Sequence, residues 1–331
     1  MKTLREMYQT SFANFRKNWL NSLILGLVCG FFLATLFLLN IVLGGIGTLL
    51  VLLLGLPFLF ACLMVNRSLR YNGSVTFKSL YVFGLLFWRK PFSSTFRFWM
   101  SLLWTILVNV VVSAILAVIC YFVFEREAHF VENIKALAEA VNNNASIDTI
   151  NAIMARDNDQ LYRYICSASV PGSAIQLVVF THFILLEQPS MYHRARFPQL
   201  HPQAHRMIYK NAIRDYRGTF LKYYYGLNFP LFILLLGGAG LGAYIGYLLY
   251  GYSSGTMIGI SHAGAILMAS LYLPIVFHNQ EAIYDEFEPL FKRAQSDLIN
   301  AYNRQLHDLD GTIHVKEVKE EEIEEQDITK Q

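Results

Sequence analysis

The sequence feature that most constrains the fold is an apolar run from Trp19 to Val65 that contains no Asp, Glu, Lys, Arg or His. A helix of about 20 residues crosses the ~30 Å hydrocarbon core of a bilayer, so the run is long enough for two passes. The cluster Gly44-Gly45-Ile46-Gly47 near its midpoint offers a tight turn between them. The run therefore predicts a hairpin of two membrane-spanning helices.

The other apolar segments indicate four more spans, and the chain is too apolar for a soluble domain. Of its 331 residues, 54% are hydrophobic and only 15% are charged, which is outside the usual composition of soluble globular proteins. We predict an all-α, polytopic membrane protein with six transmembrane helices arranged as three hairpins. The predicted spans are residues 19–43, 46–66, 98–124, 168–188, 223–250 and 256–277.

Segments between the spans predict amphipathic helices on the cytoplasmic membrane surface. Apolar residues recur at helical spacing over residues 1–18, 80–88, 204–222 and 280–306. Residues 125–167 are polar, and they predict an external insertion of two short helices around an Asn-rich turn, with Ser146 as the N-cap of the second. The membrane domain thus covers residues 1–306, and the acidic stretch 307–331 predicts a disordered cytoplasmic tail.

The distribution of basic residues predicts the orientation of the spans. With six spans, both termini and the connections at 66–97 and 189–222 lie on one side of the membrane. That side carries 23 of the 27 Lys and Arg residues. Basic residues concentrate on the cytoplasmic side of membrane proteins. We therefore predict that both termini are cytoplasmic and that the insertion at 125–167 faces outward.

Three cytoplasmic junctions between a surface helix and a span resemble one another. They occupy residues 11–27, 91–107 and 215–233. Each combines Phe, a nearby basic residue and further aromatic residues that lead into a span, and each hairpin returns to a polar exit such as 278–281. The similarity indicates three repeats of a surface helix followed by a hairpin. The alternative is that any cytoplasmic junction collects the same residue types.

A set of residues at the end of the second span forms a further pattern, which is Pro57, Arg67, Arg70, Gly73 and Phe77 followed by the junction at 92–104. This set resembles the YesL-like family of bacterial membrane proteins, and the stretch 192–220 is similar to that family's second such junction. The resemblance covers roughly two-thirds of the chain; the insertion and the long C-terminal helix depart from it. It implies a bacterial inner membrane and, because members have unsettled functions and often lie beside sugar-uptake genes, an accessory role near carbohydrate transport.

Polar side chains inside or at the ends of the predicted spans are candidates for function, because burying them in lipid is costly. They are Asn109, Gln176, His182, Glu187 and His262. In one interpretation, His182, Glu187 and His262 line a polar path for a proton or a small solute. In the other, which we favour, the histidines hydrogen-bond across helices and Glu187 pairs with Arg67 or Arg70. The reason is that a proton-coupled carrier usually needs a carboxylate deep in the membrane, and the interiors of the predicted spans contain none.

Glycines at four-residue spacing predict close packing between spans. Gly26 and Gly30 form such a pair in the first span. A longer row of glycines lies in the fifth span, and a matching row of small residues lies in the sixth. These rows are Gly238, Gly242 and Gly246 in the fifth span and Gly255, Gly259 and Ala263 in the sixth. We expect the two rows to face each other.

Cysteines and histidines show none of the spacings typical of a metal site or a dithiol redox motif. Cys120 and Cys166 lie near the outer ends of neighbouring spans, so a disulfide between them is left open. His193, His201 and His205 lie among basic residues on the cytoplasmic side, where we expect them to meet lipid phosphates. We predict no metal and no cofactor.

The sequence also lacks the motifs of common enzyme classes, including nucleophile elbows and phosphate loops. We predict no enzymatic activity and no nucleic-acid binding, because the membrane face explains the basic residues. The leading hypothesis is a non-enzymatic accessory or scaffold protein whose partners are the lipid bilayer and a membrane protein such as a solute transporter. The alternative is a small-solute or lipid transporter with a polar path between hairpins. A midplane cavity lined by Asn109, His182 and His262 would favour that alternative.

Overall fold

A computed structural model describes residues 1–43, 50–72, 80–82, 84, 91–197, 200 and 202–310 of the chain. The regular elements in these residues are all helices, which confirms the expected all-α class for this part of the chain. They are α1 (Leu4–Lys17), α2 (Trp19–Leu43), the π-helix η1 (Val51–Gly55), α4 (Leu56–Asn72), α6 (Pro91–Phe124), α7 (Phe130–Asn142), α8 (Ile147–Met154), α9 (Arg156–Arg196), α10 (Pro202–Arg214), α11 (Arg217–Tyr250), α12 (Ser254–Ser270) and α13 (Leu273–Asp310). The predicted turn at 44–47, most of the predicted helix at 80–88 and residues 311–331 of the predicted tail lie outside the described residues.

Four helices in the described part are long and apolar enough to cross a bilayer, so the protein is a multi-pass membrane protein. They run over Trp19–Leu43, Leu103–Phe124, Arg156–Leu186 and Arg217–Tyr250. α12 and α13 together form a fifth, bent candidate. The predicted second span corresponds to a shorter apolar helix, Leu53–Leu69. Length and composition of the described helices thus account for four or five of the six predicted spans.

The predicted sixth span at 256–277 is not one straight helix, because the chain bends inside it. α12 ends at Ser270, α13 begins at Leu273, and the two axes differ by 65°. Pro274 accounts for the break, since proline lacks a backbone N–H and its ring crowds the preceding turn; it is accommodated in the first turn of a new helix. The predicted surface helix at 280–306 is therefore the continuation of α13.

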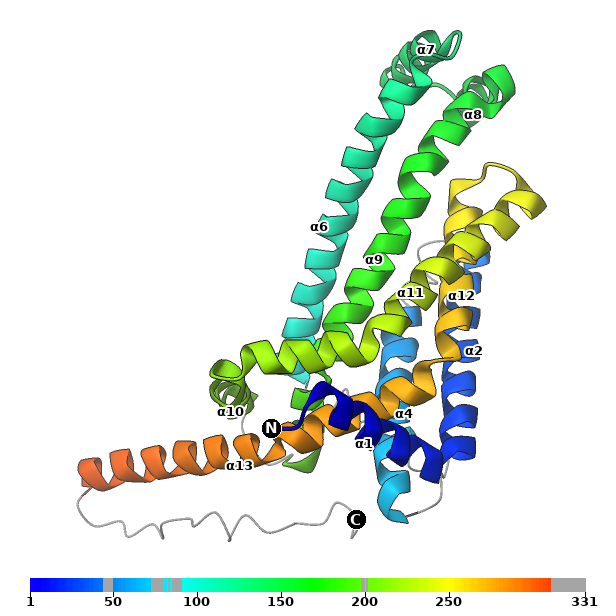
Figure 1. Cartoon of the computed structure of the whole chain (residues 1–331). Coiled ribbons are helices and arrows are strands. Elements are labelled where there is room, and N and C mark those ends of the chain that lie inside the picture. The colour runs from blue at the N-terminus through cyan, green and yellow to red at the C-terminus, as the bar shows by residue number, and fades with distance from the viewer. Residues whose placement is uncertain are drawn as a thin grey trace.

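Further helices flank the bundle of long helices at both ends, as Figure 1 shows. α7 and α8 lie at one end, close to where α6 ends and α9 begins. At the opposite end α1 and α13 run across the ends of the long helices, and α10 packs against α13. We call α1, α10 and α13 the surface layer, and α2, α4, α9, α11 and α12 the bundle.

α6 stands at the edge of the molecule and packs mainly against α9. Along its most apolar stretch none of its residues is buried inside the protein. Leu107, Val110 and Phe122 are each at least half exposed. This helix therefore presents an apolar face that lipid or another membrane protein must cover.

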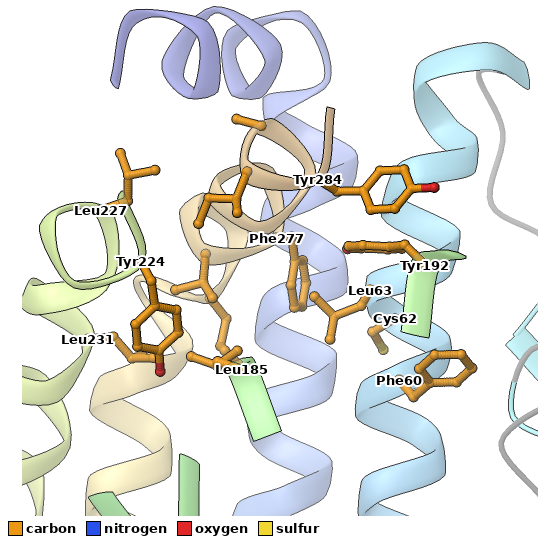
Figure 2. Packing of buried hydrophobic residues seen from close by; sticks show 14 of the residues in the cluster. Phe60, Cys62, Leu63, Leu185, Tyr192, Tyr224, Leu227, Leu231, Phe277 and Tyr284 are labelled. Carbon is orange, nitrogen blue, oxygen red and sulfur yellow. The ribbon is translucent and has the colours of Figure 1, made fainter. Parts of the chain in front are cut away.

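The main apolar core lies where the bundle meets the surface layer (Figure 2). Phe277, in the first turns of α13, lies beside Leu63 of α4. Leu185 of α9 and Tyr224 of α11 belong to the same cluster. All four side chains are almost completely buried. The first turns of α13 are thus embedded among the bundle helices rather than lying on top of them.

The polar insertion contains two short helices, α7 and α8, as the sequence predicts. The side chain of Ser146 caps α8 by accepting a hydrogen bond from the backbone N–H of Thr149 at 3.2 Å. Phe130, Ile153 and Leu161 are buried in a small apolar cluster that belongs to this region. α9 begins inside the insertion, well before the predicted start of the fourth span.

The glycine row of the fifth predicted span lies at the contact between α11 and α12. A Cβ added to Gly238 would lie 2.5 Å from the carbonyl oxygen of Gly264, and one added to Gly246 would lie 3.2 Å from the Cα of Met257. Gly242 meets the α12 backbone between these two points. The two backbones therefore approach so closely that side chains at Gly238 and Gly242 would not fit.

The face of α12 that meets this row differs from the predicted one. Gly259 points toward Ile41 of α2, and a Cβ added to Gly255 would have no neighbour within 4 Å. α11 instead meets Met257 and Gly264. Positions two residues apart lie about 200° apart around an α-helix, so Gly259 faces almost the opposite direction from Met257.

Gly26 and Gly30 of α2 face the bend between α12 and α13. A Cβ added to Gly26 would lie 2.7 Å from the ring of Pro274, and Gly30 faces the side chain of Ser270. These two small residues allow α2 to approach the point where the sixth predicted span bends.

Candidate functional site

Buried polar side chains gather where the surface layer meets the bundle, and we take this polar junction as the candidate functional site. Its members are Ser11, Ser22, Asn66, Arg67, Tyr192, Asn228, His278, Asn279, Glu281, Tyr284 and Asp285. Glu281 is 0% exposed and His278 is 2% exposed. A carboxylate buried this deeply is rare unless hydrogen bonds or an opposite charge compensate for the lost water.

Four side chains of the polar junction form a closed hydrogen-bond ring. The amide Nδ2 of Asn66 donates to Oε1 of Glu281 at 2.7 Å, and Oγ of Ser22 donates to Oδ1 of Asn66 at 2.8 Å. Ser22 Oγ also lies 2.9 Å from Nε2 of His278, whose Nδ1 lies 3.3 Å from Oε2 of Glu281. The hydrogen-bond ring connects α2, α4 and α13 and gives each carboxylate oxygen a partner.

Asn279 connects the surface layer to α11. Its Oδ1 accepts a hydrogen bond from Ser11 Oγ of α1 at 2.5 Å, and its Nδ2 donates to the carbonyl oxygen of Leu227 at 2.8 Å. A longer contact of 3.4 Å joins the same Nδ2 to Oδ1 of Asn228. Ser11, Asn228 and Asn279 are each at most 1% exposed. Buried hydrogen bonds therefore tie both α1 and α13 to the bundle.

Arg67 carries the positive charge of the polar junction. Its Nη2 lies 3.1 Å from Oδ1 of Asp285, and its guanidinium lies 4.5 Å and 5.2 Å from the ring centroids of Tyr284 and Tyr192. Figure 2 shows these two tyrosines next to each other. Burial raises the pKa of the Tyr192 hydroxyl, which lies in α9 beyond its candidate span Arg156–Leu186.

The polar junction thus combines a carboxylate, an imidazole and a guanidinium in a space shielded from water. Together these groups can hold helices in one arrangement, and the carboxylate and the imidazole can also bind or release a proton, whereas the guanidinium keeps its charge. Gln280, between Asn279 and Glu281, is also 0% exposed. Neither end of its side-chain amide has a hydrogen-bond partner among the described residues. Buried polar atoms usually have hydrogen-bond partners, so this amide is an exception to ordinary packing.

The two intramembrane histidines predicted as candidates lie in separate places. His182 of α9 has its Nδ1 3.1 Å from the hydroxyl of Tyr224, and its ring stacks on Tyr225 with centroids 5.6 Å apart. His262 of α12 has its Nδ1 2.7 Å from the carbonyl oxygen of Ile258, and it stacks on Phe37 of α2 at 5.2 Å. Each histidine is thus engaged with a different helix pair.

The remaining predicted candidates also have local surroundings. Asn109 accepts a hydrogen bond from Ser113 Oγ of its own helix at 3.2 Å, and Gln176 is half-buried in α9. Glu187 is part of α9, but its side chain lies outside the described residues. Arg67 forms an ion pair with Asp285 of α13, and the expected pairing of Glu187 with Arg67 or Arg70 involves side chains outside the described residues.

A small cavity of about 50 Å³ lies between the bundle helices. Its lining is apolar apart from Thr181, and includes Leu33, Leu63, Leu185, Leu231 and Phe277. Asn109, His182 and His262 do not line it. The cavity in the described part of the chain is therefore a gap in apolar packing, and it does not join the predicted polar candidates into one path.

His193 and His205 differ from the prediction that they meet lipid phosphates. They are 3% and 4% exposed, and their Nδ1 atoms lie 3.1 Å apart. His205 Nε2 lies 3.1 Å from the carbonyl oxygen of Phe197. The face of α10 that carries His205 turns inward because α10 packs on α13, where Tyr209 stacks on Phe291. His201 lies outside the described residues.

All four cysteines are free thiols, so the disulfide between Cys120 and Cys166 that the sequence left open is not formed. Cys29 and Cys62 are completely buried in the core. Within the described ranges, no cluster of three or more His, Cys, Asp and Glu side chains is placed to hold a metal ion.

Sequence reasoning missed the polar junction, because it treated 278–281 as the polar exit of a hairpin. A signal was nevertheless present. Phe277 and Ile283, on either side of this polar run, are completely buried and apolar, and Ala282 between them is too. Four consecutive residues point to all sides of a helix, so a polar run between apolar neighbours must place some of its side chains on the buried face of that helix.

Comparisons with family models, curated proteins and solved structures find no match to this chain. The polar junction is therefore characterised by its burial, its hydrogen bonds and its charges. It is a buried, charged connection between the surface layer and the bundle of a multi-pass membrane protein.

Proposed function

We propose that the protein is a non-enzymatic accessory or scaffold protein of a bacterial inner membrane, with its surface layer on the cytoplasmic face. The proposed topology has six spans, formed by α2, α4, α6, α9, α11 and α12, and both termini inside. The placement of the surface layer at one end of the long helices and of α7 and α8 at the other supports this topology. The excess of Lys and Arg in the segments assigned to the cytoplasm supports it independently.

The observation that carries the proposal is the polar junction. Its buried hydrogen bonds fix α1 and α13 relative to α2, α4 and α11. A surface held in one geometry loses little conformational entropy when it binds a partner. The surface layer is therefore suited to serve as a platform for specific recognition.

A membrane-embedded solute transporter is the proposed class of partner. The YesL-like resemblance of residues 57–77 and 192–220 suggests this class, with carbohydrates as the solute. The exposed apolar face of α6 is compatible with a partner inside the bilayer, since the chain itself leaves Leu107 and Val110 at least half exposed. Membership in that family and the transported solute are part of the proposal.

Copurification from membranes in mild detergent, after cross-linking in intact cells, tests this proposal. We expect the wild-type chain to recover a transporter subunit that mass spectrometry identifies. Asn279→Ala removes the hydrogen bonds that join α13 to α1 and α11. It should lower recovery by about fivefold, the change that a loss of ~1 kcal/mol in binding free energy produces. Gln160→Ala removes a buried amide in the insertion and should leave recovery unchanged. Failure to recover a transporter subunit, or equal recovery with Asn279→Ala, contradicts the proposal.

A second candidate is a small-solute or lipid transporter, and Glu281 is the observation that favours it. This carboxylate is fully buried and lies one helical turn beyond Phe277, which lines the cavity. Uptake of labelled sugars and of labelled lipids by reconstituted vesicles is the test. Uptake by the wild type that Glu281→Gln abolishes would support this candidate, and no uptake of either class by the wild type would contradict it.

A further inference from the structure

The hydrogen-bond ring has four donor–acceptor contacts, but its members supply only three hydrogens when Glu281 is ionised and His278 is neutral. Its four contacts join Asn66 to Glu281, Ser22 to Asn66, Ser22 to His278 and His278 to Glu281. Asn66 supplies one hydrogen to the ring, because its carbonyl side faces the other neighbour, and Ser22 supplies one. A neutral imidazole supplies one and an ionised carboxylate supplies none. Three hydrogens therefore face four contacts.

No other assignment of donors and acceptors supplies the missing hydrogen. With Glu281 ionised, Asn66 must turn its Nδ2 toward Oε1, since two acceptor oxygens do not approach to 2.7 Å. Asn66 Oδ1 then needs the hydroxyl hydrogen of Ser22, so Ser22 accepts from His278 Nε2. Nδ1 of a neutral His278 is left as a bare lone pair opposite the carboxylate. Reversing the Asn66 amide moves the empty contact elsewhere in the ring without filling it.

We propose that His278 and Glu281 form a buried proton-binding site, in which one added proton closes the hydrogen-bond ring. The proton comes from water and binds the free lone pair of the imidazole or of the carboxylate. The bound state is either an imidazolium beside a carboxylate or a neutral imidazole beside a carboxylic acid. In both, each of the four contacts holds one hydrogen. The site is independent of which partner the surface layer contacts.

The groups around the ring neither supply nor replace this proton. Arg67 forms an ion pair with Asp285 at 3.1 Å, and its charge also acts on Glu281, but among the described residues it forms no hydrogen bond with a member of the ring. Tyr192 and Tyr284 flank Arg67 with their rings, and Phe15 of α1 meets the edge of His278 with centroids 5.9 Å apart. The α11 contribution, Asn228, is uncharged and lies against Asn279.

Loss of the proton at alkaline pH should open the ring and loosen the contact between α13 and the bundle. A buried carboxylate would then face a bare imidazole nitrogen, which is unfavourable in a site without water. Proton binding therefore couples the attachment of the surface layer to cytoplasmic pH. The stabilisation is present while the proton is bound and is lost as pH rises.

Glu281→Gln provides the sharpest variant, because its amide supplies the fourth hydrogen permanently. We expect the wild-type Tm in detergent to fall by about 2–4 °C more than that of Glu281→Gln between neutral and alkaline pH. Glu288→Gln is the matched control: it makes the same charge change on the same helix, at a carboxylate 3.8 Å from Lys292, and should behave like the wild type. Parallel falls in the wild type and Glu281→Gln would overturn the proposal.

Spectroscopy of the wild type at neutral pH keeps the test independent of how the variants fold. Nitrogen-15 labelling of histidine, assigned with His278→Gln, reports how many ring nitrogens of His278 carry a proton. Infrared difference spectra against Glu281→Gln report whether Glu281 is a carboxylic acid. A doubly protonated His278 or a protonated Glu281 supports the site. A neutral His278 together with an ionised Glu281 overturns it.

Discussion

We compare two polar clusters among the described residues, which lie at opposite ends of the long helices and are built differently. The polar junction joins residues as far as 268 positions apart, such as Ser11 and Asn279. The second, the insertion cluster, consists of Glu127, Asn133, Asp157, Gln160 and Arg163, and its hydrogen bonds span at most 36 positions. Glu281 is completely buried, whereas Asp157 is exposed.

This difference decides what each cluster does for the fold. Charges that stay near water gain little from pairing, about 0–1 kcal/mol for an exposed pair. Removing one partner of a buried charge leaves the other uncompensated and costs several times more. The insertion cluster therefore shapes a local turn, while the polar junction fixes how the surface layer sits on the bundle.

The largest expected effect compares two asparagines that each donate to a carboxylate. Asn66→Leu removes the donor to Glu281, 2.7 Å away and completely buried, and should lower the free energy of unfolding by about 3–4 kcal/mol. Asn133→Leu removes the donor to Asp157 at 2.6 Å, but water can replace it there, so we expect a loss of about 1–2 kcal/mol. Thermal unfolding in one detergent measures both, and equal losses would remove the distinction between the clusters.

The next comparison uses two arginines with the same kinds of partners. Arg67 pairs with Asp285 and lies over two tyrosines; Arg163 pairs with Glu127 at 2.8 Å and lies over Phe124 at 5.7 Å. The Arg67 and Asp285 side chains are 14% and 24% exposed, against 30% and 37% for Arg163 and Glu127. Arg67→Met should therefore cost about 2–3 kcal/mol.

Arg163→Met serves as its control and should cost less than about 1 kcal/mol. Chemical unfolding followed by intrinsic tryptophan fluorescence measures both variants. A larger loss for Arg163→Met than for Arg67→Met would mean that burial does not decide the strength of these pairs.

A smaller, local effect is expected at the helix cap of the insertion. Ser146→Ala removes the side-chain acceptor for the N–H of Thr149 and should destabilise α8 by about 1 kcal/mol. Hydrogen exchange should speed up in Ile147–Met154 and stay unchanged in α13, because the two regions share no polar contact in the described residues. Faster exchange in α13 would show that the clusters are coupled.

The smallest expected effect is a change in the pKa of one exposed histidine, His129. The hydrogen bond that His129 Nδ1 donates to the Glu132 carboxylate raises the pKa of the exposed His129 above its ordinary value. A raised histidine pKa means that the interaction stabilises the folded state while His129 is protonated, and that this stabilisation disappears as pH rises through the folded pKa. Nuclear magnetic resonance should show the His129 pKa falling toward its ordinary value in Glu132→Gln, where Asp157 still acts on it, and no change there would rule out this pair.

The insertion could be predicted from sequence because its determinants are local. Ser146 precedes α8 directly, and its bonding partner Thr149 lies three residues on. The apolar runs likewise predict the long helices, because each segment that crosses lipid must by itself be long and apolar enough. The glycine row at Gly238 and Gly242 marked a close helix contact for the same reason, although the facing surface of α12 did not follow from spacing alone.

The polar junction could not be predicted in the same way. Its environment depends on the bend at Pro274, which directs the first turns of α13 into the bundle. It also depends on contacts of α13 with α1 and α4, which are far from it in the sequence. Without that bend, Glu281 reads as a solvent-facing residue of a surface helix. The pairing of Arg67 with Asp285 is hidden for the same reason, because tertiary structure selects one partner among many carboxylates.

Hydrogen–deuterium exchange of the full-length protein in lipid nanodiscs tests most directly whether the polar junction anchors the surface layer. The segment 276–285 should be among the slowest to exchange outside the long membrane helices, clearly slower than α7 and α8, and Asn66→Leu should accelerate it. Exchange of 276–285 as fast as that of α7 and α8 in the wild type would contradict the account.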